Sequence, residues 1–360
     1  MKNVFFACGP FTALLCYCIA VAKHSAEDNV LFIVPDFKES LKFADVFRDG
    51  KNSPFSNVYC MYGGYGKRSK LHNRFISKQN ISFVKKFIES NEIKNIYSSN
   101  DVDSEGQALF YFAKKKDKNI RTVCIEDGAA MYGEATRNKK SGIKILLAKI
   151  FYGYWWHDVK IYGLSPWTDE IIVTQPTLVR KDVAHKKMTE IAHEDFMKLE
   201  ENIAFKQFMS DLGTTENLLN QIEILLILPF HDFFVTNKYR EKVLEKVFNL
   251  VRRSGRKLAV KYHPREPEED FLSIKKEKDI IILPRAIPLE LFYIFSSESV
   301  KLVIGDISTA LMNARWIFSD KTKVVSVVNV LDYREDNLLE AFKKQGIDLV
   351  NDMNFLNNYV

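Results

Sequence analysis

Two short polar motifs could carry chemistry, and the first is acidic. Glu126-Asp127-Gly128 directly follows the apolar run 121–125. A carboxylate at the end of a buried strand is partly desolvated, which raises its pKa toward that of a useful general base. Gly128 would let the backbone turn sharply and let a ligand come close. An acid-acid-Gly sequence on its own is more often a solvated turn, so this motif needs support from elsewhere in the chain.

The second motif, around His263-Pro264, is basic and follows the end of the expected strand 257–262, with Lys261 and Arg265 on either side. Pro264 favours an extended backbone at His263, which helps to fix the direction of the imidazole. Two permanent cations and one group that titrates near neutral pH suit a phosphate ligand. A surface loop with a structural histidine explains the pattern about equally well.

Two further stretches offer groups that could bind a nucleotide. Gly305 ends an apolar run, and Ser308-Thr309 opens a helical pattern. Helix N-termini present free N–H groups to phosphates, and hydroxyls there add donors. Glu290, near the start of another helical pattern, could accept hydrogen bonds from ribose hydroxyls. The plain alternatives are helix capping by Ser308 and a favourable acid in a first helical turn.

These motifs need a fold that brings the ends of several strands together. Apolar runs alternate with helical patterns in the first and last thirds of the chain, which predicts mostly parallel sheets covered by helices. Ligands bind such sheets at the carboxyl ends of the strands. The expected strands are 3–7, 30–34, 58–61, 93–98 and 121–125, then 223–228, 257–262, 280–283, 302–305 and 323–328. The expected helices are 11–22, 82–90, 105–115, 238–254, 289–295 and 308–317.

A chain of 360 residues suits two α/β domains. We expect an N-terminal Rossmann-like domain over residues 1–165 that carries the base. A connection would follow over 166–216, with a helix within 195–212. The C-terminal Rossmann-like domain, 217–360, would bind the donor, and its last helix could pack back on the first domain. The two sheets would face a central cleft that holds both motifs.

Composition narrows the class of protein. The net charge of +6 favours anionic partners such as nucleotides, acidic sugars or a membrane surface, but it is too diffuse to indicate nucleic acid. Five cysteines without CxxC spacing indicate free thiols in a reducing compartment. Gly9-Pro10 breaks the apolar stretch 4–22, which predicts a strand, a turn and a helix rather than a signal or membrane segment. We therefore expect a cytoplasmic protein.

The order of the motifs resembles that of bacterial sialyltransferases, especially the lipooligosaccharide sialyltransferases and the capsule polysialyltransferases. The resemblance covers roughly residues 121–314. Members of this group share an acid-acid-Gly, a His-Pro and a Ser/Thr pair. The corresponding residues here are Glu126-Asp127-Gly128, His263-Pro264 and Ser308-Thr309.

The resemblance implies a GT-B fold and inverting transfer of sialic acid, or a related nonulosonic acid, from a CMP-activated donor. It implies no metal and no other cofactor. The acceptor would be lipooligosaccharide or capsule glycan, which fits a peripheral position at the inner face of the cytoplasmic membrane. By position, Glu126 matches the general base, and Asp127 and Gly128 would shape its turn. His263, Ser308 and Thr309 match the residues at the donor phosphate, and Glu290 matches the ribose-binding acid of related enzymes. From their places at strand ends, Lys261, Pro264 and Gly305 are further candidates for the same donor site.

Other interpretations stay open. Asp101-Val102-Asp103 is a DxD, a metal-binding pattern in another class of glycosyltransferases. We prefer a loop in which Asn100 and Asp101 lie near the acceptor and no metal binds. A CMP-Kdo or CDP-polyol-phosphate transferase of capsule or teichoic-acid synthesis would use similar motifs.

A non-catalytic nucleotide-binding scaffold docked on a membrane is a different class of protein. The basic, aromatic segment 144–162 could lie on a membrane interface. An ordinary core helix with lysines on its wet side explains that segment slightly better.

Overall fold

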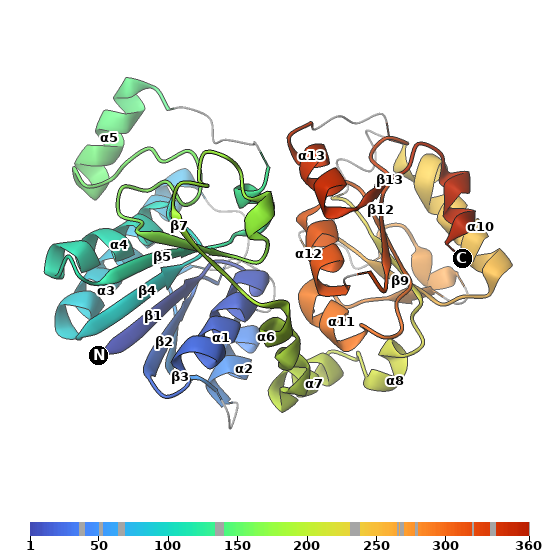
Figure 1. Ribbon diagram of the computed structural model, residues 1–360, viewed down its shortest axis with the longest axis horizontal. Helices are drawn as coiled ribbons and strands as arrows, with labels where there is room; N and C mark the ends of the chain where they lie inside the picture. The colour runs from blue at the N-terminus through green and yellow to red at the C-terminus, as the bar shows by residue number, and fades with distance from the viewer. Residues whose placement is uncertain are drawn as a thin grey trace. The chain divides into compact units, whose positions relative to one another are not determined.

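The computed structural model divides the chain into two compact units, Met1–Phe196 and Met197–Val360. The structure describes residues 1–35, 40–49, 53–63, 69–133, 140–230, 238–264, 266, 270–277, 280–318, 320–331 and 336–359. Each unit is built on a parallel sheet with helices on its faces (Figure 1).

The first sheet has the strand order β3-β2-β1-β4-β5-β6-β7, and every strand pair is parallel. The order reverses between β1 and β4, and such a switch point is where open parallel sheets bind ligands. The strands are β1 (Lys2–Ala7), β2 (Asp28–Ile33), β3 (Phe55–Cys60), β4 (Ile93–Ser98), β5 (Arg121–Ile125), β6 (Glu170–Val173) and β7 (Lys187–Glu190).

Helices cover both faces of this sheet. Phe6 and Phe32 pack with α3 and α4 on one face, whereas Phe5 meets Phe55 on the face that carries α1 and α2 (Figure 1). This alternation follows from the period of two along a strand. The helical elements are α1 (Pro10–His24), α2 (Ser40–Asp49), α3 (Lys70–Ser90), α4 (Ser104–Lys116), η1 (Gly128–Met131), α5 (Gly142–Tyr152), η2 (Pro176–Leu178) and α6 (His193–Met197).

The apolar stretch 4–22 folds as predicted, into β1 and α1. Pro10 occupies the first turn of α1, where its missing N–H breaks no helical hydrogen bond. Among the residues that the structure describes, no helix has the length and hydropathy needed to cross a membrane.

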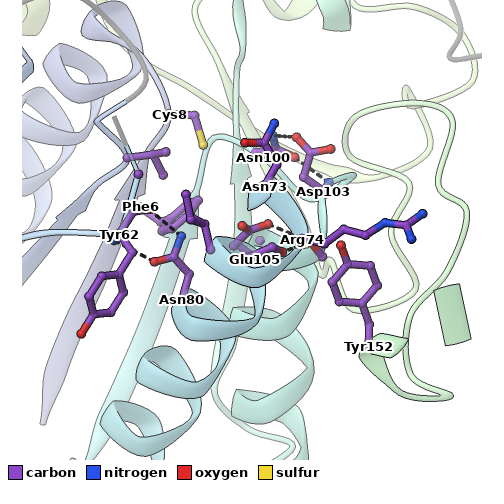
Figure 2. Close-up of a pocket in the computed structure, with 16 residues that line it drawn as sticks. Phe6, Cys8, Tyr62, Asn73, Arg74, Asn80, Asn100, Asp103, Glu105 and Tyr152 are labelled. Atoms are coloured by element: carbon purple, nitrogen blue, oxygen red, sulfur yellow. Dashed lines mark hydrogen bonds between the residues drawn. The ribbon is translucent and has the colours of Figure 1, made fainter. Parts of the chain in front are cut away.

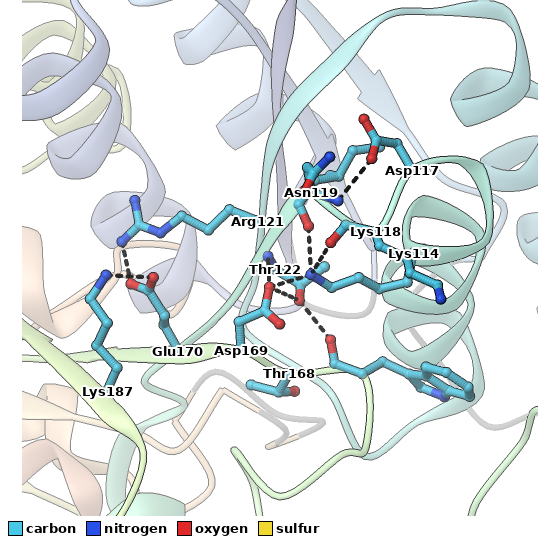
Figure 3. Close-up of polar contacts among 12 residues, drawn as sticks. Lys114, Asp117, Lys118, Asn119, Arg121, Thr122, Thr168, Asp169, Glu170 and Lys187 are labelled. Atoms are coloured by element: carbon cyan, nitrogen blue, oxygen red, sulfur yellow. Dashed lines mark hydrogen bonds and ion pairs between the residues drawn. The ribbon is translucent and has the colours of Figure 1, made fainter.

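An ion-pair network at the amino ends of β5 and β6 sets the register of these strands (Figure 3). Arg121 and Lys187 both pair with Glu170. Asp169 accepts hydrogen bonds from the backbone N–H and the hydroxyl of Thr122, each at 3.0 Å. These contacts fix how far each strand extends, and so which residues emerge at the opposite, carboxyl edge.

The second sheet has the order β10-β9-β8-β11-β12-β13, again with parallel pairs. Its strands are β8 (Ile224–Ile227), β9 (Leu258–Lys261), β10 (Ile280–Ile282), β11 (Leu302–Gly305), β12 (Lys323–Ser326) and β13 (Asp348–Leu349). Its helical elements are η3 (Lys198–Glu201), α7 (Ile203–Asp211), α8 (Glu216–Leu219), η4 (Arg240–Leu244), α10 (Glu245–Ser254), η5 (Ile274–Lys276), α11 (Leu289–Phe295), α12 (Thr309–Phe318), α13 (Asp336–Gln345) and η6 (Met353–Asn358). Both units therefore share the Rossmann order 3-2-1-4-5-6, which the first unit extends by one strand.

The structure differs from the sequence-based prediction in three places. The expected connection, 166–216, contains β6 and β7, which lengthen the first sheet; both are short, and Lys187–Glu190 has no apolar run. The final element, η6, packs into the core of its own unit through Met353 and Leu356. The segment expected to hold a core helix instead forms α5, which buries none of its residues.

Candidate active site

Glu126 lies directly after β5, and only 1% of its surface is exposed. Its Oε2 accepts hydrogen bonds from the Tyr132 hydroxyl, at 2.5 Å, and from the backbone N–H and hydroxyl of Thr174, each at 2.7 Å. Thr174 follows the neighbouring strand β6, so the donors come from the same sheet edge. From the described part of the chain, no donor reaches Oε1, which leaves this oxygen to take a proton.

Burial raises the pKa of the Glu126 carboxyl to about 7. The hydrogen bonds from Tyr132 and Thr174 favour the carboxylate and limit the rise, while the neighbouring charge of Asp127 adds to it. A carboxyl with a pKa near neutral pH is partly ionised there and still basic enough to accept a proton from a hydroxyl during reaction. Glu126 therefore has the electrostatic character of a general base.

The turn after Glu126 is formed by Asp127 and Gly128. Gly128 has a φ of +53°, in the left-handed region that favours glycine over residues with a Cβ. Asp127 is half-buried and stands immediately before η1, which starts at Gly128. The negative charge of Asp127 adds to the raised pKa of the Glu126 carboxyl. Its position therefore fits a residue that adjusts the pKa of the base rather than the base itself.

Asn100 and Asp101, which were expected near the acceptor, lie in different surroundings. Asp101 is fully buried, and its carboxylate accepts from the backbone N–H groups of Gly163 and Ser165 and from the Thr168 hydroxyl at 2.8–3.0 Å. It therefore ties the β4–α4 loop to residues 163–168 instead of facing a substrate. Asn100 lines a pocket, and it donates from Nδ2 to Asp103 at 2.7 Å.

The two acids of the DxD have different partners. The Asp101 oxygens are held by hydrogen-bond donors, and Asp103 stands at the start of α4 next to Asn100. Within the described ranges, no group of three or more His, Cys, Asp or Glu side chains is arranged to hold a metal ion.

A pocket of about 600 Å³ opens at the carboxyl ends of β1 to β4, which is the switch point of the first sheet (Figure 2). Figure 2 shows Tyr62 and Asn80 on one side of the pocket and Arg74, Glu105 and Tyr152 on the other. A Cβ at Gly106 would meet the Asn100 carbonyl oxygen at 1.5 Å, so only glycine lets α4 start this close to the loop. Aromatic, amide and carboxylate side chains together suit a polyhydroxylated ligand such as a sugar.

In the second unit, Lys261 and Glu290 are buried. The Lys261 ammonium donates to the carbonyl oxygens of Pro284 and Ile287, at 2.5 and 2.8 Å, so it holds the loop that leads into α11. Glu290 accepts from the Asn313 side chain at 2.7 Å, and burial raises the pKa of its carboxyl. Sequence reasoning put Lys261 on the phosphate; its carbonyl partners make it a residue that positions α11 instead.

The remaining donor-side residues lie around the carboxyl end of β8. His263 follows β9 and packs its ring edge-on against Phe230, which follows β8, with ring centroids 5.6 Å apart. Ser308 and Thr309 follow β11 on the other side of β8 and are half-buried. Pro264 is exposed. Arg265 lies outside the described residues.

The α12 N-terminus follows closely on β11. The Ser308 hydroxyl accepts from the Ala310 N–H at 3.2 Å, and a Cβ on Gly305 would come within 3.0 Å of the Leu311 side chain. Because β9 and β11 flank β8, the strand ends that His263 and this helix start follow are roughly 10 Å apart, two strand spacings along one sheet edge. That edge includes the switch point of the second sheet, where the fold binds nucleotides.

Comparison with known proteins identifies the family. A family model described as alpha-2,8-polysialyltransferase matches residues 22–327, a stretch that includes Glu126, His263, Ser308 and Thr309. The chain belongs to this polysialyltransferase family. The resemblance inferred from the motifs is thereby confirmed. A search of curated proteins found no match.

Solved structures show that this polysialyltransferase-family protein has the GT-B fold. The sialyltransferase GT-B domain from Photobacterium damselae aligns with a TM-score of 0.57 and 12% identity, covering 98% of each chain. The UDP-GlcNAc 2-epimerase from Methanocaldococcus jannaschii aligns with a TM-score of 0.60 and 13% identity, covering 100% of this chain and 91% of the other. The Neisseria meningitidis epimerase bound to UDP-GlcNAc aligns at 0.57 with 13% identity, over 99% and 90%. The family and the fold together support a glycosyltransferase that carries out sialyl transfer.

Sequence reasoning missed several residues of the site in this polysialyltransferase-family protein. Thr174 could have been found, because it directly follows the short apolar run 171–173 in the way that Glu126 follows 121–125. Tyr132 and the pocket residues Arg74 and Tyr152 carry no local signal. They reach the site from helices and loops whose placement depends on tertiary packing.

Proposed function

We propose that this protein transfers sialic acid, or a related nonulosonic acid, from a CMP-activated donor to a glycan acceptor with inversion at the anomeric carbon. The observation that carries the proposal is Glu126, a buried carboxyl with one oxygen held by three hydrogen bonds and a pKa of about 7. Membership of the polysialyltransferase family supports sialyl transfer as its chemistry.

Glu126 would act on the acceptor. Its Oε1 removes the proton from the attacking hydroxyl as the new bond forms between that oxygen and the anomeric carbon. Tyr132 and Thr174 hold the carboxyl through Oε2, so little rearrangement is needed during transfer. A fixed base that is already desolvated lowers the barrier more than a mobile one in water.

The second unit would act on the leaving group. As the bond from the anomeric carbon to the phosphate oxygen breaks, CMP departs with its negative charge. The His263 imidazolium, the hydroxyls of Ser308 and Thr309 and the N–H groups at the start of α12 would stabilise that charge. Glu290 lies on α11, the helix that precedes β11 and α12 in the chain, where it could accept a hydrogen bond from a ribose hydroxyl.

The pocket in the first unit would hold the acceptor sugar. The pocket reaches the carboxyl end of β4 at Asn100. β4 is the direct neighbour of β5, and Glu126 directly follows β5. Neighbouring strands lie about 5 Å apart, so a sugar in the pocket would present a hydroxyl on the Glu126 side.

A donor screen with the purified full-length protein tests this function. CMP release from CMP-sialic acid should depend on a glycan acceptor, and should exceed turnover of CMP-Kdo, CDP-glycerol and UDP-GlcNAc. Preference for CMP-Kdo or CDP-glycerol would favour a capsule or teichoic-acid transferase, and no turnover of any donor would favour a nucleotide-binding scaffold.

We also propose that the reaction needs no metal, because the cationic and N–H groups of the second unit can meet the charge of one monophosphate. Treatment with EDTA should leave the rate of CMP release unchanged. Loss of activity that Mn²⁺ restores would contradict this and revive a carboxylate-bound metal.

A further inference from the structure

Helix α5 presents an aliphatic stripe that nothing in the described structure covers. Ile143, Leu146, Leu147 and Ile150 are between 53% and 73% exposed. Their spacing of i, i+3, i+4 and i+7 places all four on one face of the helix. Figure 1 shows α5 at the periphery of the first unit, outside the helices that cover the sheet. An exposed apolar patch of this kind is typical of a binding surface for an apolar partner.

The opposite face of α5 anchors the helix to the protein. Ile145, Ala148 and Tyr152 are half-buried, and Tyr152 stacks near Trp156 with ring centroids 6.4 Å apart. The Lys78 ammonium lies over the Phe151 ring at 5.1 Å. Attachment along one face leaves the aliphatic stripe pointing away from the body of the unit.

The charges of α5 identify the partner. Helical geometry places Lys144 and Lys149 roughly 110° to either side of the stripe, and neither pairs with an acid in the described residues. The helix has no acidic residue of its own. Lysines that flank an apolar face can bury their stems and reach anionic headgroups. A symmetric second copy would instead bring these lysines toward like charges.

We infer that α5 docks this protein on an anionic lipid surface, with the stripe in the acyl boundary and the two lysines at the headgroups. Tyr154, which is exposed just beyond the helix, adds an aromatic group suited to the interface. Eleven residues are too few to span a bilayer, so the helix lies in the membrane plane.

Docking by α5 would bring the pocket of the first unit to the membrane. Tyr152 lies on the anchoring face of α5 and also lines that pocket. If the proposed function holds, the acceptor would be a glycan linked to a membrane lipid. The docking itself does not depend on that function, and a binding assay tests it separately.

Co-sedimentation of the full-length protein with vesicles tests the docking. The protein should bind vesicles of phosphatidylglycerol and phosphatidylcholine in equal parts. Leu146→Ser/Ile150→Ser should reduce partitioning at least about tenfold, because two aliphatic side chains no longer enter the lipid. Lys144→Gln/Lys149→Gln should reduce it about fivefold per lysine on these vesicles and leave binding to phosphatidylcholine alone unchanged.

Ile203→Ser is the matched control, since Ile203 is also exposed but lies on α7 in the second unit. Its partitioning and the thermal unfolding of every variant should equal those of wild type. Absence of vesicle binding by wild type, or binding by Leu146→Ser/Ile150→Ser that equals it, would overturn the proposal. A dimer in sedimentation equilibrium that Leu146→Ser/Ile150→Ser dissociates would assign the stripe to a second copy instead.

Discussion

The two units share a strand order but place opposite chemistry at their carboxyl edges. The first unit presents a buried acid, Glu126, whose pKa burial raises to about 7. The second presents half-buried donors, His263, Ser308 and Thr309, beside a helix N-terminus. The comparison teaches that the Rossmann order fixes where ligands bind, while burial at each edge decides whether the edge takes up a proton or stabilises an anion.

The largest expected effect comes from the acidic edge. Glu126→Gln should lower the rate of sialyl transfer by about 10²–10⁴-fold, the usual contribution of a positioned general base. The amide oxygen can still accept from Tyr132 and Thr174, so the fold and the affinity for CMP should be kept. Steady-state kinetics and CMP calorimetry measure the two quantities separately.

Asp127→Asn is the matched control for Glu126→Gln, because it removes the adjacent carboxylate and leaves the base. Its transfer rate should fall far less than that of Glu126→Gln. Equal losses in the two variants, or a transfer rate for Glu126→Gln near that of wild type, would show that the acidic edge does not supply the base.

The donor edge should respond next most strongly. His263→Ala should lower transfer by about 10²-fold, as expected for loss of one group that stabilises a developing anion. Unlike Glu126→Gln, it should also weaken CMP binding, and this difference separates the roles of the two edges. His185→Ala, at an exposed histidine of the first unit, should change neither quantity. Unchanged transfer in His263→Ala would remove the imidazole from the phosphate site.

The hydroxyls of the donor edge should matter mainly for binding. Ser308→Ala/Thr309→Ala should raise the Kd for CMP roughly ten- to hundredfold, since two ordinary hydrogen bonds together contribute about 1–3 kcal/mol. Thr309→Ala alone keeps the Ser308 cap on α12, so its calorimetry separates lost ligand contacts from a weakened helix. Undiminished CMP affinity in the double variant would argue against the phosphate site.

The inner strands of the sheets were predictable from sequence because they are buried on both faces, as β1, β2, β8 and β11 are over nearly their whole length. That burial requires continuous apolar runs, and β4, β5, β11 and α11 keep the predicted bounds. The edge strand β7 is mostly polar and carries no such run, so the first domain was predicted too short.

The failures at the site have a common physical cause. Lys261 follows an apolar run like a ligand-binding residue, but whether carbonyl oxygens capture its ammonium depends on the loop from β10 to α11. Asp101 is a similar case, with its donors some 60 residues away in sequence. Helix α5 is apolar around most of its circumference, a pattern typical of core helices, and only the packing of its neighbours shows that one face stays exposed.

A smaller effect is expected from changing the environment that sets the pKa of Glu126. If the carboxylate is the base, kcat/KM should rise with pH through about 7, with the free enzyme's pKa as midpoint. The Tyr132 hydrogen bond stabilises the carboxylate, so Tyr132→Phe should raise that midpoint, by about one unit. Activity should then fall several-fold at pH 7 and recover at higher pH, which a purely structural defect would not do. A pH profile that shifts downward or stays in place would contradict this assignment.

The same pKa makes a prediction for stability, and its sign follows from proton binding. Between the ordinary pKa of 4.5 and the raised value of about 7, the folded protein holds a proton on Glu126 that the unfolded chain has lost. Stability from this group is therefore full below pH 4.5 and declines as pH rises toward 7. Glu126→Gln removes the decline, so its Tm relative to wild type should be higher at pH 8 than at pH 5.

Glu290→Gln is the comparison in the second unit, where burial also raises the carboxyl pKa. The Asn313 hydrogen bond and, to a smaller extent, the charge of Lys261 limit that rise. We therefore expect the Tm of Glu290→Gln relative to wild type to change less between pH 5 and pH 8 than that of Glu126→Gln. A larger change for Glu290→Gln would place the main cost of burying a carboxylate on the donor edge instead.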